Sequence, residues 1–280
     1  PHEFLIKAAE LTRTGIGLPA YYNDEVIIPA LQNRGLSLED AREYNIIGCV
    51  EPQKAGKTDG WHDAAFFNMC RPLELVFSNG MDKGELVGIQ TGDVTKMTTF
   101  EEFFDAYKKQ MEYCISLMVN ADNAIDVAHA ERVPLPYESC MVDDCLSRGL
   151  SVQEGGAVYN FTGPQGFGIA NMADSLYAIR KLVYEDKKVS MEEYKQALAW
   201  NYDKGLDQQS VSDMSEMILK GMQDAGMAVN TDIAKAVLQT VMRLKPTEDQ
   251  LRRFTEIHHM IDEVLKFGNA IDDVDYFARD

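Results

Sequence analysis

The sequence predicts an α/β fold in which helices outnumber strands. Several stretches repeat apolar residues at steps of three and four, which places them on one face of a helix. Shorter stretches are rich in β-branched and aromatic residues and end at glycine or proline, which is typical of strands. Apolar residues make up 45% of the 280 residues, so the chain can bury a substantial core.

Helices are expected where the apolar repeat is longest. The repeat runs through residues 103–118, 169–183, 233–244 and 251–265. A Ser or Thr followed three residues later by Glu or Gln is a capping-box pattern, and it predicts three helix starts. These pairs are Thr99 with Glu102, Ser190 with Glu193, and Thr247 with Gln250.

Strands are expected at "NIIGCVEPQ" (45–53), "ELVGIQTG" (85–92) and "AVYNFTG" (157–163). Cys49 would then lie at the end of a strand or on the loop that follows it. The glycine-rich stretch 155–168 lacks the Gly-Lys-Ser/Thr ending of a phosphate loop. We therefore expect close packing of the backbone there rather than phosphate binding.

Composition excludes several classes of protein. The formal net charge of −18 argues against binding nucleic acid or anionic membrane surfaces. No apolar run approaches about 20 residues, so no membrane span is expected. Five cysteines without a C-x-x-C spacing argue against a disulfide framework or a zinc ribbon. With no export signal, they predict a cytoplasmic protein. Because the chain starts with Pro1, we expect it to be a piece of a longer protein.

Cys49 and Glu51 form the first candidate site. In strand-like geometry residues two apart face the same side, which places a thiol beside a carboxylate. A neighbouring carboxylate raises the pKa of a thiol, which is the wrong direction for a thiolate nucleophile. A thiyl radical carries no charge and can abstract a hydrogen atom while the carboxylate takes a proton. The pair therefore suits radical chemistry better than it suits a thiolate nucleophile.

Asp63 is the second candidate. Four apolar residues, 64–67, follow it, so we expect it to face a shielded space where substrate hydroxyls supply its hydrogen bonds. His62 is expected to be a structural histidine. The spacing of Cys140 and Cys145 suits no common zinc site, and adjacent His258 and His259 point to different sides of a helix. No metal is therefore expected in this chain.

Four motifs together resemble the glycyl radical enzymes. They are "GCVEPQ" at 48–53, "GKTDGWHDAAFFN" at 56–68, "MVDDCLSRG" at 141–149 and "GGAVYNFTGPQGFGIANMADSL" at 155–176. The resemblance is to the branch that holds glycerol and propanediol dehydratases and pyruvate formate-lyase-like proteins. It covers roughly residues 15–203 and resumes near 267. It implies part of a ten-stranded α/β barrel surrounded by helices, with the radical cysteine on a loop at its centre.

The resemblance also implies roles for the candidate residues. Cys49 matches the thiyl radical cysteine, Glu51 the general base for a substrate hydroxyl, and Asp63 the aspartate that hydrogen-bonds a substrate hydroxyl. The implied cofactor is a glycyl radical, made by a radical S-adenosylmethionine activating enzyme. The Arg-Val-x-Gly-Tyr motif of that glycine does not occur in these 280 residues, so the glycine is expected outside them. A homodimer acting on a small-molecule substrate is also implied.

The implied organisation is a barrel segment at 1–204, a helical insertion at 205–266 and a return to the barrel at 267–280. The insertion is expected to lie outside the barrel and to contact a partner or a second subunit. The 280 residues alone are expected to be inactive.

The implied reaction is elimination from glycerol or 1,2-propanediol. Several alternatives stay open. Within the family they are isethionate-type C–S cleavage, hydroxyproline dehydration and pyruvate formate-lyase-like acyl transfer. From other classes they are a thiol redox or metal-binding protein using Cys49, His62 and Cys70, and a non-catalytic helical interaction module.

Overall fold

The computed structural model describes residues 1–16, 19–200 and 246–264, with residues 216, 218–220, 222–224, 230 and 233–235 between them. The chain divides into two compact units. The first comprises residues 1–66 and 120–165, and the second comprises residues 67–119 and the described residues from 166 onward. The domain boundaries expected after 204 and 266, and the whole of 267–280, lie outside the described residues.

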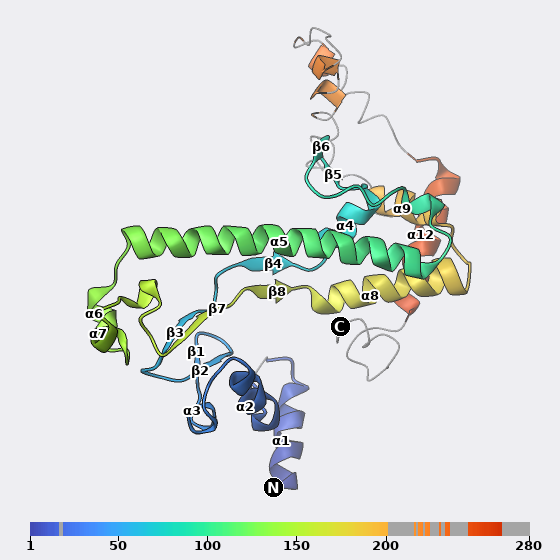
Figure 1. Cartoon of the computed structure of the whole chain (residues 1–280). Helices are drawn as coiled ribbons and strands as arrows, with labels where there is room; N and C mark the ends of the chain where they lie inside the picture. Colours follow the sequence, from blue (N-terminus) through green and yellow to red (C-terminus); the bar gives the residue numbers. More distant parts are fainter. Residues whose placement is uncertain are drawn as a thin grey trace. The chain divides into compact units, whose positions relative to one another are not determined.

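The first unit holds short helices and the strands that position the candidate site (Figure 1). Its elements are α1 (His2–Thr12), α2 (Asp24–Asn33), α3 (Leu38–Arg42), β1 (Asn45–Ile47), β2 (Glu51–Gln53), β3 (Thr58–Trp61), α6 (Pro136–Ser139), α7 (Cys145–Arg148), a 3-10 turn (Val152–Glu154) and β7 (Tyr159–Thr162). Polar N-caps start two of the helices. The side chain of Asn23 accepts from the amide of Glu25, and that of Ser37 accepts from the amide of Asp40.

Two strand pairs organise this unit. β1 and β2 form an antiparallel hairpin in which Ile47 faces Glu51, so the turn consists of residues 48–50. β3 pairs in parallel with β7, with Thr58 opposite Tyr159. A parallel pair needs a long crossover connection, and α5 (Phe100–Arg132) forms part of it.

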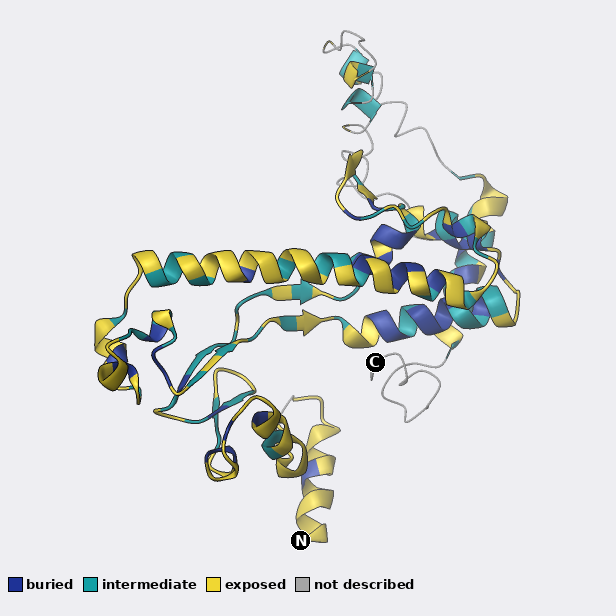
Figure 2. Cartoon of the chain, in the orientation of Figure 1, coloured by how far each residue is buried: buried dark blue, intermediate teal, exposed yellow. Residues whose placement is uncertain are grey.

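The second unit contains the larger hydrophobic core. Its elements are β4 (Phe66–Asn68), α4 (Arg71–Phe77), β5 (Met81–Asp82), β6 (Glu85–Leu86), a 3-10 turn (Val94–Lys96), the first part of α5, β8 (Gln165–Phe167), α8 (Ile169–Ile179), a π-helical turn (Arg180–Glu185), α9 (Met191–Ala199) and α12 (Glu248–Glu263). β4, β8 and α5 cross the division between the units. Fully buried side chains come from α5, α8 and α12, including Phe103, Leu176 and Ile257. Figure 2 shows the buried faces of these helices and the exposed second half of α5.

The helix predictions are confirmed where the chain is described. All three capping pairs form; in the first, the amide of Glu102 donates to the Thr99 hydroxyl over 3.2 Å, and the Glu102 carboxylate accepts from the Thr99 amide. The stripe at 169–183 continues from α8 into the π-helical turn. Of the stripe at 233–244, only residues 233–235 are described, and they are helical.

The strand predicted at 85–92 is mostly wrong. Only Glu85–Leu86 form a strand, and the rest is a loop. The reason lies in the buried side chain of Gln110, which accepts from the amide of Ile89 and donates to its carbonyl over 2.5 Å. A side chain therefore satisfies the backbone groups that a neighbouring strand would otherwise take. At Gly156 the predicted close packing is confirmed, since a Cβ there would lie 2.4 Å from the carbonyl oxygen of Leu150.

The predicted α/β class with many helices is confirmed. The described strands form four two-stranded pairs, β1–β2, β3–β7, β4–β8 and β5–β6, and the ten-stranded barrel stays a prediction. Within the described ranges, no helix is both long enough and apolar enough to cross a membrane.

Candidate active site

Cys49 lies on the turn of the β1–β2 hairpin, as the strand pattern predicts. Its neighbour Gly48 has a φ of 60°, in the left-handed region that glycine adopts without strain. The Tyr22 hydroxyl donates to the carbonyl of Cys49 over 3.1 Å, so a backbone contact also fixes the turn. Cys49 itself is exposed. The hairpin therefore presents the thiol at its tip.

The carboxylate of Glu51 folds back over the same turn. Its Oε2 accepts from the amide of Cys49 over 2.7 Å and from that of Val50 over 2.9 Å. The hydrogen bond from the Val50 amide is the main cause that lowers the pKa of Glu51, and the bond from the Cys49 amide adds to it. The side chain is therefore anionic at neutral pH. A Cβ at Gly48 would lie 2.7 Å from Oε2, so the arrangement needs glycine there.

The expected reason for this proximity is wrong, although the two residues do lie together. Cys49 is in a turn rather than a strand, so side-chain alternation does not place it beside Glu51. Instead, two backbone N–H groups of the turn attract the carboxylate.

Asp63 follows β3, in the loop before β4, and it is exposed. The shielded environment expected from residues 64–67 is not found within the described chain, because Phe66 is itself 64% exposed. His62 is half-buried, and its Nε2 lies 3.3 Å from Oε1 of the buried Gln53. Burial lowers the pKa of His62, so the ring is neutral at pH 7, which fits a structural role. Together with Pro52, it lines a cavity of about 300 Å³.

Gln165 connects the two candidate carboxylates. Its Nε2 donates to Oε1 of Glu51 over 3.0 Å and also to Oδ1 of Asp63. Sequence reasoning gave Gln165 no role, although it stands in one of the four motifs that carry the resemblance. The available signal was a polar residue directly after Pro164, whose ring restricts the local backbone.

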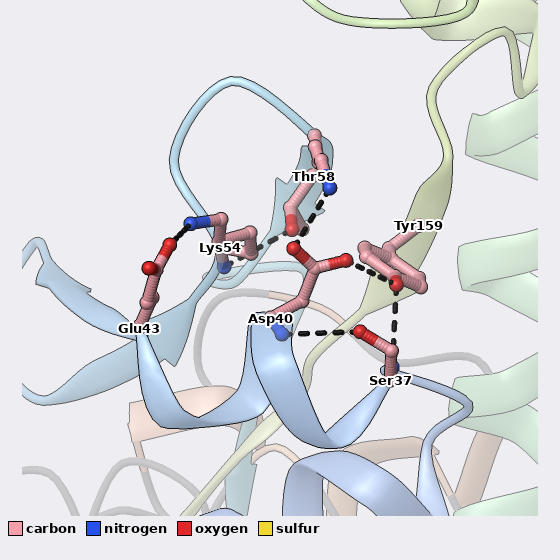
Figure 3. Close-up of polar contacts among 7 residues, drawn as sticks. Ser37, Asp40, Glu43, Lys54, Thr58 and Tyr159 are labelled. Atoms are coloured by element: carbon pink, nitrogen blue, oxygen red, sulfur yellow. Dashed lines mark hydrogen bonds and ion pairs between the residues drawn. The ribbon is translucent and has the colours of Figure 1, made fainter.

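A polar network fixes the base of the hairpin (Figure 3). Asp40 of α3 is only 7% exposed, and it accepts from Lys57 Nζ over 2.8 Å and from the Tyr159 hydroxyl over 2.7 Å. The hydrogen bond from Lys57 foremost lowers the pKa of Asp40. Lys54, directly after β2, pairs with Glu43, directly after α3, over 2.6 Å. The residues that flank the hairpin are thus bonded to α3 and β7.

Asp59 of β3 has the opposite electrostatic environment. It is partly buried, and burial first, then the charges of Glu138 and Asp126, raise its pKa to about 6. An unfolded aspartate has a pKa of about 3.9. Protonation of Asp59 therefore stabilises the folded state relative to the unfolded state. This contribution to stability is fully present below about pH 4 and is lost as pH rises through about 6.

We expect Asp59→Asn to raise the stability of the full-length protein at pH 8, because the amide carries no charge. Allowing for solvent screening, the gain is about 1 kcal/mol. Thermal unfolding at pH 5 and pH 8 checks it: the gain should shrink at pH 5, where the wild-type carboxyl is largely protonated. Asp249→Asn, on an exposed aspartate paired with Arg252, is the control and should show no gain. Equal stability of Asp59→Asn and wild type at both pH values would contradict the assignment.

All five cysteines are free, and within the described residues no group of three His, Cys, Asp or Glu side chains is placed to hold a metal ion.

Comparison with known proteins identifies the family. The model of the family described as "Pyruvate formate lyase-like" matches residues 1–280. The chain belongs to this family. It is 40% identical over 204 residues to a (2S)-3-sulfopropanediol dehydratase of Klebsiella oxytoca, covering 72% of this chain and 25% of that protein. It is 38% identical over 205 residues to a trans-4-hydroxy-L-proline dehydratase of Clostridioides difficile, covering 72% and 26%.

Solved structures of family members show the same fold. One such structure comes from work on 1,2-propanediol dehydration in Roseburia inulinivorans. It is 62% identical in sequence with a TM-score of 0.91, and the match covers 100% of this chain and 33% of that chain. The glycerol-bound B12-independent glycerol dehydratase of Clostridium butyricum is 47% identical with a TM-score of 0.75, covering 100% and 29%. The resemblance to glycyl radical enzymes, which have an α/β barrel fold, is thus confirmed. The chain spans about a quarter to a third of the length of these relatives.

Proposed function

We propose that the complete protein is a glycyl radical lyase that removes water from a small diol such as glycerol or 1,2-propanediol. One observation carries the proposal: Cys49 at the hairpin tip, Glu51 beside it and Asp63 belong to a single hydrogen-bonded group. The resemblance to structures from work on propanediol and glycerol dehydration supports the choice of substrate.

Cys49 is the proposed hydrogen-atom carrier. A glycyl radical elsewhere in the complete protein would supply the unpaired electron, and the exposed thiol of Cys49 at a loop tip could give up its hydrogen atom to it. Cys49 then takes a hydrogen atom from a carbinol carbon of the substrate. After the elimination it returns that hydrogen atom to the carbon radical of the product, so the thiol is restored.

Glu51 is the proposed proton acceptor. The hydroxyl on a carbon radical is more acidic than that of the parent alcohol, so a carboxylate with a lowered pKa is a sufficient base. Each carboxylate oxygen has two lone pairs, so Oε1 can bond Gln165 and still accept from a substrate. Deprotonation gives a ketyl radical anion, which breaks the bond to the neighbouring hydroxyl. The proton that Glu51 took passes to that departing hydroxyl, so water leaves and the carboxylate is restored.

Charge favours a neutral diol over the open alternatives within the family. Glu51 and Asp63 are two acidic side chains bonded to one amide. A sulfonate or carboxylate bound beside them would meet like charge, whereas diol hydroxyls can donate to both.

The remaining parts of the proposal concern the complete protein. We place the chain in a ten-stranded barrel and the radical glycine outside these 280 residues, with no metal in this part of the protein. A radical S-adenosylmethionine enzyme would activate it, and the assembly would be a cytoplasmic homodimer.

Product analysis tests the function. Full-length protein, activated anaerobically, should convert glycerol or 1,2-propanediol to the aldehyde. Isethionate, (2S)-3-sulfopropanediol and trans-4-hydroxy-L-proline serve as competing substrates. Turnover of a sulfonate or of hydroxyproline in preference to both diols would overturn the diol assignment.

Asp63→Asn should lower the turnover of a diol by at least about tenfold. The reason is that a hydrogen bond to a charged group contributes roughly 1.5–3 kcal/mol. Steady-state kinetics with both diols measure the effect. Asp105→Asn, on an exposed aspartate paired with Lys108, is the matched control and should leave turnover unchanged. Unchanged kinetics for Asp63→Asn would remove this residue from the site.

A further inference from the structure

The amide of Gln165 occupies a place that few side chains could fill. It lies between two acidic side chains that come from separate segments, the β1–β2 hairpin and the loop after β3. Its backbone is held independently, because the amide nitrogen of Gln165 donates to the carbonyl of Ala65 over 2.8 Å. The half-buried side chain therefore reaches both carboxylates from a fixed strand end.

Hydrogen-bond accounting determines the orientation of this amide. Glu51 and Asp63 are acceptors when ionised, and a primary amide has two N–H donors on one nitrogen. Only the orientation with the NH₂ group toward the carboxylates satisfies both acids. Two neighbouring carboxylates repel each other. The amide is neutral, and it can donate one hydrogen bond to each of them.

The two oxygens of Glu51 are held by different partners. Backbone amides of Cys49 and Val50 hold Oε2, and Gln165 holds Oε1. Loss of the Gln165 amide would thus leave the hairpin turn and its backbone contacts in place. It would release the rotation of the Glu51 carboxylate and its fixed separation from Asp63.

We propose that Gln165 is a positioning residue that holds the Glu51 and Asp63 carboxylates at the separation of two neighbouring substrate hydroxyls. This inference rests on the function proposed above. Glu51 takes the proton of one hydroxyl while Asp63 accepts a hydrogen bond from the other. The Gln165 amide fixes the positions of these two carboxylates relative to each other.

Gln165→Met tests the proposal in activated full-length protein. Methionine has a similar length and shape but no N–H donor. We expect kcat for a diol to fall about 10- to 100-fold, with little change in KM. This is the fold-change that corresponds to the loss of one hydrogen bond to a charged group. The glycyl radical signal should be unchanged. Gln196→Met is the matched control, because the Gln196 amide also donates to a carboxylate, that of Glu192, on α9.

The pH profile separates positioning from a general structural role. Without the Gln165 donor the pKa of Glu51 should rise, so the acid limb of kcat/KM should move to higher pH. The other titratable groups that face Glu51 are His62, Asp63 and the Cys49 thiol. None of them is altered by the substitution, so a shift of the limb reports on the lost donor.

Gln165→Glu is the second variant and decides the matter if Gln165→Met does not fold. A third carboxylate would repel the other two at neutral pH, and its protonated form regains one donor. Activity relative to wild type should therefore recover as pH falls. A pH profile identical to that of wild type would contradict the proposal.

The proposal and the function can fail separately. If Cys49→Ser or Glu51→Gln turns over diol normally, the function itself is wrong. If both are inactive while Gln165→Met keeps the wild-type kcat and acid limb, only the role of Gln165 is wrong.

Discussion

Cys49→Ser in the full-length protein should abolish turnover while the glycyl radical still forms. The S–H bond is weak enough to form the thiyl from the stored radical, yet the thiyl can still attack a carbinol C–H bond. A serine O–H bond is too strong for the stored radical to break. Serine should fit the turn, because the contacts that fix it involve the amide and carbonyl of Cys49 and not its sulfur.

Spin quantification and product analysis measure the two halves of this result. The EPR signal of the variant should match that of wild type, and no aldehyde should form. Cys140→Ser is the control, because Cys140 is another exposed thiol outside the hydrogen-bonded group, and its turnover should be normal. The 280 residues alone, without the radical glycine, should show no signal. Normal turnover by Cys49→Ser would overturn the radical mechanism.

Local sequence signals predicted the features that depend on a few neighbouring residues. The three capping pairs form because side chain and backbone are three residues apart on one turn. The position of Cys49 in a turn follows from Gly48 before it, which can adopt a positive φ, and from Pro52 after it, which restricts the local backbone.

Features that depend on distant residues were not predicted. The parallel pairing of Thr58 with Tyr159 joins segments about 100 residues apart, and no local pattern specifies it. The loop at 87–92 is set by Gln110, which lies on another element. Gln165 was missed for the same reason, because its partners Glu51 and Asp63 meet it only after the β3–β7 crossover.

The exposure of Asp63 has a similar cause. Whether an acidic side chain is shielded depends on which residues pack over it. The apolar residues that follow Asp63 do not cover it. Residue types within one segment can predict the chemistry of a site, but they do not predict its enclosure.

Glu51→Gln should keep the glycyl radical and lose about 10²–10⁴-fold in turnover, the usual contribution of a positioned base. The glutamine carbonyl can still accept from the amides of Cys49 and Val50, so the turn should persist. Its NH₂ group would then face the NH₂ group of Gln165, and neither can accept from the other or from a substrate hydroxyl. The variant removes the proton acceptor while keeping the shape of the site.

Turnover across pH separates this effect from a change in folding. Wild-type kcat/KM should fall on the acid side as Glu51 takes a proton, and that limb should vanish in Glu51→Gln. Glu10→Gln is the matched control, because it removes the exposed ion pair with Lys7 on α1 but no group of the hairpin or of the proposed site. Its turnover should stay close to wild type. If Glu51→Gln turned over diol within a few-fold of wild type, with the acid limb intact, the base would have to be another residue.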